Sequence, residues 1–298
     1  MRRMLICGLV ACAWAGGLRA QAVPARDLWE FPLGAVYEPA ALAVEPGVGL
    51  WNPATMALKG GERFRLGVVS LSAGSDQGVD GQLFGASYRR PSGVTLGLSV
   101  ARANVAGLLR TDSDPQTIGD IPYNSTLVSV GAAREVVPHL TAGVAVRYRS
   151  GHADVDKGRA VAADLGVVAD DLPWNHARVA VSSFLWRPGR EIQDRPALLV
   201  AADARVLGPS AQRETRLGYS YNGVNRGARE QGPYVSGRFD RLEARAGWFQ
   251  TAAGARSVSR IRSGLSFHYG RYVVGLAREE GAAGLGPVYQ FSLSSIFQ

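Results

Sequence analysis

Cysteine is nearly absent from this chain of 298 residues, and both cysteines, Cys7 and Cys12, stand close to its N-terminus. They fall within a segment that we predict to be removed on export, which would leave a mature chain without cysteine. A disulfide framework, a thiolate metal site and a catalytic thiol are then excluded. Long apolar runs are also missing, because no later stretch approaches the ~18 residues of a membrane-spanning helix.

Catalytic constellations are equally scarce. The four histidines, His139, His152, His176 and His268, are scattered, and no Gly-x-Ser-x-Gly nucleophile elbow occurs. Ser266 and His268 share one face of a predicted strand, but positions i and i+2 on a strand pair often by chance. We therefore predict that the chain is not an enzyme and has no catalytic residue.

Two further patterns concern cofactors and metals. Gly47 and Gly49 lack the third glycine and the strand–helix setting of a dinucleotide-binding fingerprint. Asp112, Asp114 and Asp120 could offer oxygen ligands to a surface cation, although a solvated loop has the same composition. We predict no cofactor and no metal site.

Positive charge is in excess but is not concentrated. The formal net charge is +8, and removal of Arg2, Arg3 and Arg19 with the export segment would leave +5. A nucleic-acid surface gathers basic residues on one face without interleaved acids. Here they alternate with Asp and Glu, so we predict no nucleic-acid partner.

The N-terminus has the pattern of a secretory signal peptide. Basic residues 1–3 precede an apolar run over 4–18, and the small residues at 20–22 suit signal peptidase. We predict a cleavable signal over residues 1–22. An alternative is a lipoprotein acylated at Cys12, since residues 9–12 resemble a lipobox, but the apolar run continues past Cys12.

Alternation with a period of two dominates the chain from residue 61 onward. Phe64 and Leu66 flank Arg65, and residues 139–149 alternate in the same way. Strands of this kind have one apolar and one polar face. Fourteen such runs are each near the ~9–11 residues that a tilted strand needs to cross a bilayer. They are 62–72, 79–90, 93–103, 123–135, 139–150, 159–170, 176–187, 196–206, 213–222, 232–238, 241–250, 258–269, 271–279 and 286–297.

Some of these strands are less regular than others. The run 232–238 is the weakest, because it is short and contains Pro233, which suits a strand end better than its middle. Runs 79–90 and 176–187 alternate imperfectly, which suggests bulges.

The connections between these runs are sorted by length. Those after even-numbered strands are short, whereas those after odd-numbered strands are mostly longer, above all residues 104–122. A membrane barrel has short periplasmic turns and longer outer loops. The sequence therefore predicts an all-β fold, a transmembrane antiparallel barrel of about fourteen strands over residues 61–298.

Charged residues fall on the polar face of these strands. A lipid-facing arginine costs about 2–4 kcal/mol at the bilayer midplane, so this face must point inward. We expect most of these charges to pair across strands, although a charged pathway or polar ligand site has the same composition. The predicted lumen-lining residues are Arg65, Arg147, Arg149, Asp164, Asp203, Arg205, Glu214, Arg216, Glu243, Arg245, Arg260 and Arg262, with His268 beside them.

The segment before the first strand, residues 33–60, is rich in Ala, Gly and Val and contains Trp51, Asn52, Pro53 and Ala54. It resembles the N-terminal segment of FadL and PorV/PorQ outer-membrane barrels, in which such an Asn-Pro-Ala tripeptide closes a plug or hatch. A plainer interpretation is a short helix that Asn52 caps and Pro53 starts.

Three more stretches support that resemblance. Residues 216–219 and 242–248 are similar to PorV/PorQ strand motifs, and the last strand ends on an aromatic residue, Phe297. Gln298 follows it, a departure from the pattern. The resemblance implies a plug over residues 23–60, with Glu38, Glu45 and Trp51–Ala54 contacting inward arginines such as Arg147, Arg245 or Arg262.

The resemblance also implies where the protein acts and with what. We expect the outer membrane of a Gram-negative-type bacterium, with outer-membrane lipid and the barrel assembly machinery as partners. Two functions fit: a channel for small, including hydrophobic, substrates, or a secretion-associated scaffold that binds secreted protein cargo. The long hydrophobic outer loops of a fatty-acid capture site are missing.

Overall fold

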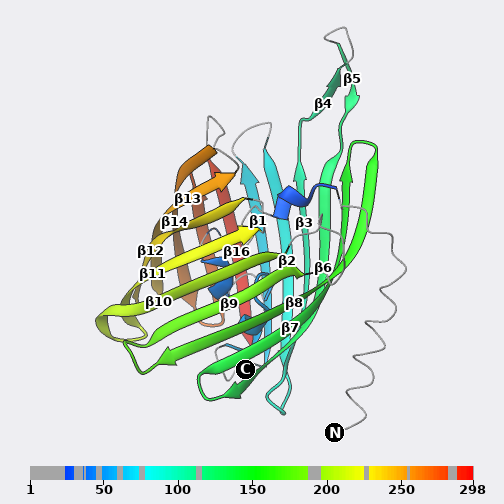
Figure 1. The fold of residues 1–298 in the computed structure, drawn as a ribbon. Helices are drawn as coiled ribbons and strands as arrows, with labels where there is room; N and C mark the ends of the chain where they lie inside the picture. The colour runs from blue at the N-terminus through cyan, green and yellow to red at the C-terminus, as the bar shows by residue number, and fades with distance from the viewer. Residues whose placement is uncertain are drawn as a thin grey trace.

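The computed structural model is a closed β-barrel (Figure 1). Among the described residues, fourteen antiparallel strands form the ring, and β1 pairs with β16 to close it. The predicted fold class is confirmed. The predicted signal peptide, Cys12 and Glu45 lie outside the described residues. These are residues 24–29, 36, 38–44, 49–58, 63–73, 78–111, 116–186, 196–224, 228–253, 256–280 and 287–297.

All fourteen predicted runs are strands of the barrel. The ring consists of β1 (Phe64–Ala73), β2 (Val79–Arg89), β3 (Thr95–Val105), β6 (Tyr123–Val137), β7 (Leu140–Ala153), β8 (Asp156–Leu172), β9 (Ala177–Trp186), β10 (Ala197–Ser210), β11 (Arg213–Val224), β12 (Arg229–Phe239), β13 (Leu242–Ala253), β14 (Arg256–Tyr269), β15 (Tyr272–Glu279) and β16 (Val288–Phe297).

Side-chain burial follows the predicted alternation along each strand. In β7, Val146 is 59% exposed whereas the next residue, Arg147, is fully buried. Because successive side chains of a strand point to opposite faces, the apolar set lies outside and the charged set inside. Apolar residues outside and charged residues inside are the reverse of the arrangement in a water-soluble protein. This arrangement matches a barrel surrounded by lipid.

The two ends of the barrel differ in their connections. One end, which we name the short-turn end, has turns at 90–94, 138–139, 173–176, 211–212, 240–241 and 270–271. His139, Asp240 and Gly270 have positive φ angles, which close the tight hairpin turns there. The other end, the long-connection end, includes residues 106–122.

The connections at the long-connection end contain more strand structure than predicted. Residues 104–122 are not all loop, because β4 (Leu109–Thr111) and β5 (Thr117–Asp120) form a hairpin that projects beyond the ring (Figure 1). The expected long connection at 151–157 is only residues 154–155, since β7 and β8 continue outward and pair there. The length rule fails here and at the β13–β14 connection, where only residues 254–255 separate the strands, and it holds for most of the others.

One of the three predicted strand irregularities is confirmed, because β9 is irregular whereas β12 is neither short nor ended by Pro233 and β2 has no bulge. β9 is offset from β8 by register shifts, as expected. β12 runs straight through Pro233, and its pairing with β13 is interrupted between Gln231 and Tyr234, because proline has no N–H to donate. The predicted bulge in β2 is wrong, since β2 pairs with β1 and β3 without a register shift.

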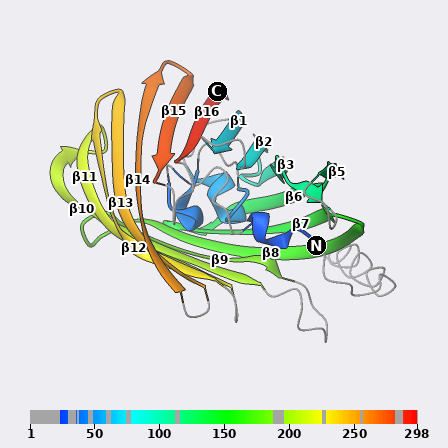
Figure 2. The same ribbon diagram turned by 90° about the horizontal axis from the view of Figure 1, so that it is seen from above.

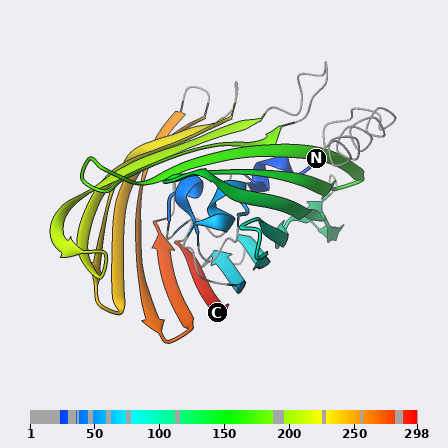
Figure 3. The ribbon, with the colours of Figure 1, turned by 90° about the horizontal axis from the view of Figure 1, so that it is seen from below.

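The described residues of the N-terminal segment lie inside the ring rather than beside it. Its short 3₁₀-helices are η2 (Arg26–Trp29), η3 (Ala40–Leu42) and η4 (Pro53–Ala57). Viewed along the barrel, these turns lie nearer to β1–β3 and β7–β9 than to β11–β13 (Figures 2 and 3). No helix in the described part of the chain is long and apolar enough to cross a membrane.

Candidate functional site

The Asn-Pro-Ala tripeptide starts a short helix that is buried inside the ring, as the plainer interpretation of its sequence predicted, and its role in a plug or hatch stays a prediction. The Asn52 side-chain oxygen accepts a hydrogen bond from the Ala54 N–H at 3.0 Å, and Pro53 is the first residue of η4. The Asn52 amide also donates to the Ala41 carbonyl at 2.8 Å. Asn52 is fully buried and ties the two lumenal helices η3 and η4 together.

Glycines in the barrel wall make room for η4. A Cβ placed at Gly97, Gly131, Gly143 or Gly166 would come within about 3.0 Å of Met56, Pro53 or Asn52 atoms. At Gly143 and Gly166 a Cβ would collide with Pro53, Ala54 or Asn52, so the wall accepts η4 there because a side chain is absent. At Gly97 and Gly131 the flexible Met56 side chain would have to move. The four glycines lie on β3, β6, β7 and β8, and we call them the glycine seat.

A buried arginine holds the segment next to that seat. Arg147 donates to the Asp164 carboxylate and to the Leu50 carbonyl, and its guanidinium stacks on the Phe184 ring at 4.8 Å. Both Arg147 and Asp164 are fully buried. A buried charge is stable only when it is paired and hydrogen-bonded, so this part of the lumen depends on the segment's carbonyl as well as on Asp164.

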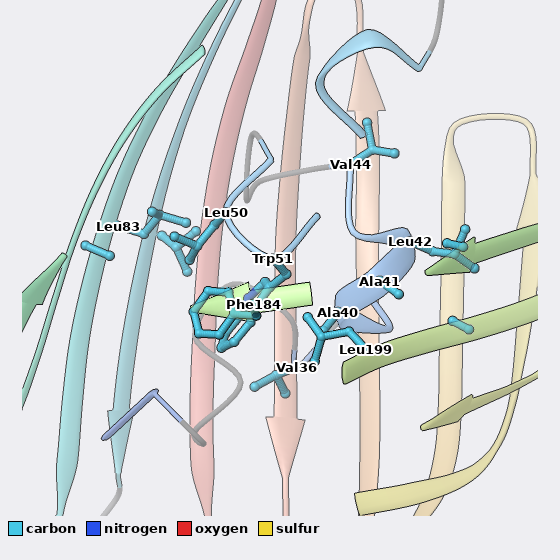
Figure 4. Close-up of a cluster of buried hydrophobic side chains, with 14 of the residues drawn as sticks. Val36, Ala40, Ala41, Leu42, Val44, Leu50, Trp51, Leu83, Phe184 and Leu199 are labelled. Carbon is cyan, nitrogen blue, oxygen red and sulfur yellow. The ribbon is translucent and has the colours of Figure 1, made fainter. Parts of the chain in front are cut away.

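The wall facing the segment is apolar, which differs from the predicted polar lumen. Trp51 packs against Phe184 with ring centroids 4.7 Å apart, and Leu42 and Leu50 join the same cluster (Figure 4). The Trp51 carbonyl accepts a hydrogen bond from Ser182 at 3.0 Å. Apolar inward residues remain possible here because the segment, not water, covers them. They include Val69, Leu71, Leu83, Leu127, Val168 and Leu199.

The other side of the segment meets charged side chains. Glu38 accepts a hydrogen bond from Arg245 at 2.8 Å through one carboxylate oxygen and from the Val44 N–H at 2.9 Å through the other. Arg245 also donates to Glu243 at 2.6 Å. The His268 Nε2 atom lies 3.7 Å from Glu243. Among the described interactions, Glu38 therefore connects the segment to the charged wall through Arg245.

That wall, on β9 to β15, is built from ion pairs between neighbouring strands. At its short-turn half, Asp203 accepts from Arg178 at 2.5 Å, from Arg216 at 2.8 Å and from the Tyr234 hydroxyl at 2.8 Å. Arg205 donates to Glu214 at 2.8 Å. Burial destabilises the charged form of a carboxylate, and here both Asp203 and Glu214 accept hydrogen bonds from arginines that offset this cost.

A second group of ion pairs lies nearer the long-connection end. Arg262 donates to both oxygens of Glu230, at 2.8 and 2.6 Å, and also to Glu279, while its guanidinium stacks on Phe249 at 4.6 Å. Arg260 donates to Glu279 at 2.8 Å. The predicted contact of Arg262 with the N-terminal segment is therefore replaced, among the described interactions, by contacts within the wall.

Open space within the described part of the lumen follows the charged wall. A cavity of about 460 Å³ lies at the short-turn half, and Arg178, Glu214, Arg238 and Ser266 are among its lining residues. A second cavity of about 20 Å³ lies beside Tyr234, Phe249 and Arg262. Glu38 and Arg245 line both cavities. The ion pair between them stands at the boundary of the two spaces.

The structure places all twelve of the predicted lumen charges, and His268, on the inward face. Arg65 and Arg149 are buried, and Arg65 donates to the Leu58 carbonyl at 3.4 Å. Trp51, Asn52, Pro53 and Ala54 are buried inside the ring. Of the three aspartates considered for a cation, Asp112 and Asp114 lie outside the described residues and Asp120 is exposed. No metal-binding group of three or more side chains occurs among the described residues.

Four wall residues were missed by sequence reasoning. Glu279 continues the inward parity of Gly275 and Ala277, so alternation alone could have identified it. Arg178 faces Asp203 across β9 and β10, but the irregular pattern of β9 concealed it. Glu230 was assigned to a loop and Tyr234 to the weakest strand, because Pro233 made β12 look shorter than it is.

Comparison with known proteins finds relatives by structure and not by sequence. No protein-family model and no curated protein matches this chain. The solved structure of CymD, a monoaromatic hydrocarbon channel, is similar with a TM-score of 0.64 and 12% identity, over 87% of this chain and 94% of that one. The Pseudomonas putida toluene transporter TodX is similar with a TM-score of 0.53 and 10% identity, over 94% and 98%. At these identities the likeness shows the fold. No comparison bears on the PorV/PorQ resemblance, which stays a prediction.

Proposed function

We propose that the protein is an outer-membrane channel for small molecules and that residues 36–58 close its lumen. The observation that carries this proposal is the position of the Glu38–Arg245 pair, which joins the segment to the charged wall at the boundary of two cavities. The exposed apolar outer face supports a membrane setting, since lipid is the solvent that would cover it. Outer-membrane lipid and the barrel assembly machinery remain its predicted partners.

The segment contacts the two halves of the lumen differently: apolar packing holds it against β3–β8, and an ion pair links it to the charged wall. On the β3–β8 side it sits against the glycine seat and packs through Trp51 and Leu50, a contact that is lost only at the cost of exposing apolar area. On the β10–β15 side η3 packs against β10, and the described ionic link to the charged wall is the Glu38–Arg245 pair, which lies beside open space. Because the open space lies beside this ion pair, we propose that the opening runs along the charged wall.

This path favours small solutes that carry polar or charged groups. Arginine and carboxylate side chains line it, and these can replace part of a polar solute's hydration. The structural neighbours are described as channels for monoaromatic hydrocarbons and toluene, which favours an apolar substrate instead. For that alternative the apolar seam between Trp51, Phe184 and Leu199 would have to open.

Benzoate and toluene test these two paths, because they share a ring and differ in one charged group. Uptake of each labelled compound should be measured in porin-deficient cells that produce the wild-type protein or the Glu38→Gln variant. The proposal expects benzoate uptake to rise in the variant and toluene uptake to stay unchanged. A rise for toluene alone would favour the hydrocarbon path, and no effect of the protein on either compound would contradict a channel for small aromatic solutes. No structural observation favours the secretion-associated alternative, so cargo binding stays a prediction.

A further inference from the structure

The outer surface of the short-turn end carries a belt of aromatic residues on one half of the barrel. Phe239, Tyr269 and Tyr272 are 66%, 62% and 40% exposed. Cross-strand pairing joins these rings in two groups, because Tyr269 faces Tyr272 and Phe64 faces both Phe297 and Tyr88. Tyr272 itself faces Ser295, and the Arg271 guanidinium bridges the two groups by stacking on Tyr272 and Phe297. Leu242 and Phe267 connect Phe239 to this row. The belt thus follows β12 to β16 and continues onto β1 and β2.

Two arginines stack on the rings of this belt. The Arg271 guanidinium lies 5.0 Å from the Tyr272 ring centroid and 5.2 Å from that of Phe297, and it donates to the Tyr272 hydroxyl at 2.7 Å. The Arg213 guanidinium lies 5.0 Å from the Phe239 ring centroid. Both arginines are exposed, and neither forms an ion pair with a described carboxylate. Stacking fixes each guanidinium in place while leaving N–H groups free to donate.

At the short-turn end, exposed arginines outnumber exposed carboxylates. The short-turn end presents Arg63, Arg90, Arg134, Arg213, Arg241 and Arg271 as exposed side chains. Its exposed carboxylates among the described residues are Glu135, Asp171 and Asp240, and Asp171 is paired with His176 at 2.5 Å. A surface with exposed aromatic rings and surplus arginine beside them matches the boundary between acyl chains and phosphate groups.

We propose that the belt from Phe239 to Tyr88, with Arg213 and Arg271, binds the phosphate groups of anionic phospholipids in the periplasmic leaflet. The rings would lie at the head-group boundary, and each stacked guanidinium would donate hydrogen bonds to a phosphate oxygen, for which its planar fork is suited. The proposal rests on the membrane setting proposed above. It adds a defined lipid site on one half of the short-turn end.

Native mass spectrometry of the detergent-solubilised protein with phosphatidylglycerol tests the site. The variant is Arg213→Gln with Arg271→Gln, and the matched control is Arg102→Gln with Arg278→Gln, two exposed arginines near the long-connection end. Each cation near an anionic lipid surface raises the affinity for that lipid roughly fivefold. The variant that lacks both belt arginines (the rim variant) should therefore bind phosphatidylglycerol at least tenfold more weakly. The control should retain wild-type binding.

Three outcomes would overturn the proposal: an equal loss in the control, unchanged binding in the rim variant, or preferential binding of lipid A over phosphatidylglycerol at these arginines. Heat-modifiable migration and channel conductance should be measured on the same samples. If all forms insert and conduct while lipid binding is unchanged, only the lipid site fails. If the wild type inserts into no membrane, the proposed function fails as well.

Discussion

Glu38 and Arg245 stand 207 positions apart in the sequence, and their side chains form an ion pair of 2.8 Å inside the barrel. The pair is the described ionic link between the lumenal segment and the charged wall, and both partners border the two cavities of the lumen. A contact of this kind can be broken without unfolding either part, because each partner keeps other hydrogen bonds. Glu38 still accepts from Val44, and Arg245 still donates to Glu243.

Neutralising this pair should favour the open channel. We expect Glu38→Gln to raise the open probability in planar bilayers, since a nearly buried ion pair becomes a weaker hydrogen bond from the charged guanidinium to a neutral amide. Arg260→Gln serves as the control, because Arg260 belongs to the wall and pairs with Glu279, away from the segment. Equal current changes in both variants would mean that wall charge, not the link to the segment, controls conduction.

Filling the glycine seat should displace η4 and leave the barrel intact. Gly143→Val places side-chain carbons where Pro53 and Ala54 lie, and overpacking of this kind costs about 1–3 kcal/mol. We expect the emission of Trp51 to change and conductance to rise, while the protein stays heat-modifiable. Gly237→Ala is the matched control, because a Cβ there has no neighbour within 4 Å. Similar behaviour of the two variants would argue against a seat.

Removing Arg147 should destabilise the barrel more than removing it together with Asp164. Arg147→Met removes the guanidinium that pairs with the fully buried Asp164 carboxylate, and breaking a buried pair in this way costs about 3–5 kcal/mol. The double variant with Asp164→Asn should recover part of that loss, because no charge remains buried. The free energy of unfolding in urea, measured in lipid vesicles, compares the two. A double variant that is less stable than the single one would refute a buried pair as the cause.

Orientation can be tested at two turns of similar size. The β7–β8 turn contains Val155, which is 76% exposed, and belongs to the long-connection end. An epitope inserted there should be labelled on intact cells, whereas one in the turn at residues 211–212 should be labelled only after permeabilisation. The reverse pattern would place the long-connection end in the periplasm and would remove the basis for the proposed lipid site.

Strand order and facing were predictable from this sequence because lipid and lumen impose opposite demands on alternate residues. Val146 and Arg147 illustrate this, since neither could occupy the other's side without a large cost. The inward direction of Asp203 and Arg216 followed from the same rule. Strand ends were less predictable, because strands such as β7 and β8 continue past the bilayer, where alternation is no longer required.

The division of the lumen into an apolar half and a charged half could not be predicted from alternation. Leu83 and Phe184 face inward as Arg147 does. They are shielded from water because the segment packs against them. That position depends on contacts between residues far apart in the sequence, such as Asn52 against Gly166. Sequence periodicity reports which side of a strand a residue occupies and carries no information on what fills the space beyond it.

Single-channel conductance with and without the segment tests the central claim most directly. The wild-type protein and a variant lacking residues 36–58 should be compared in planar bilayers, after both are shown to be heat-modifiable and therefore folded. The account predicts small or rare openings in the wild type and a larger, persistent conductance in the deletion variant. Equal conductance in two folded proteins would contradict it, because the lumen would then be closed by the wall's own side chains.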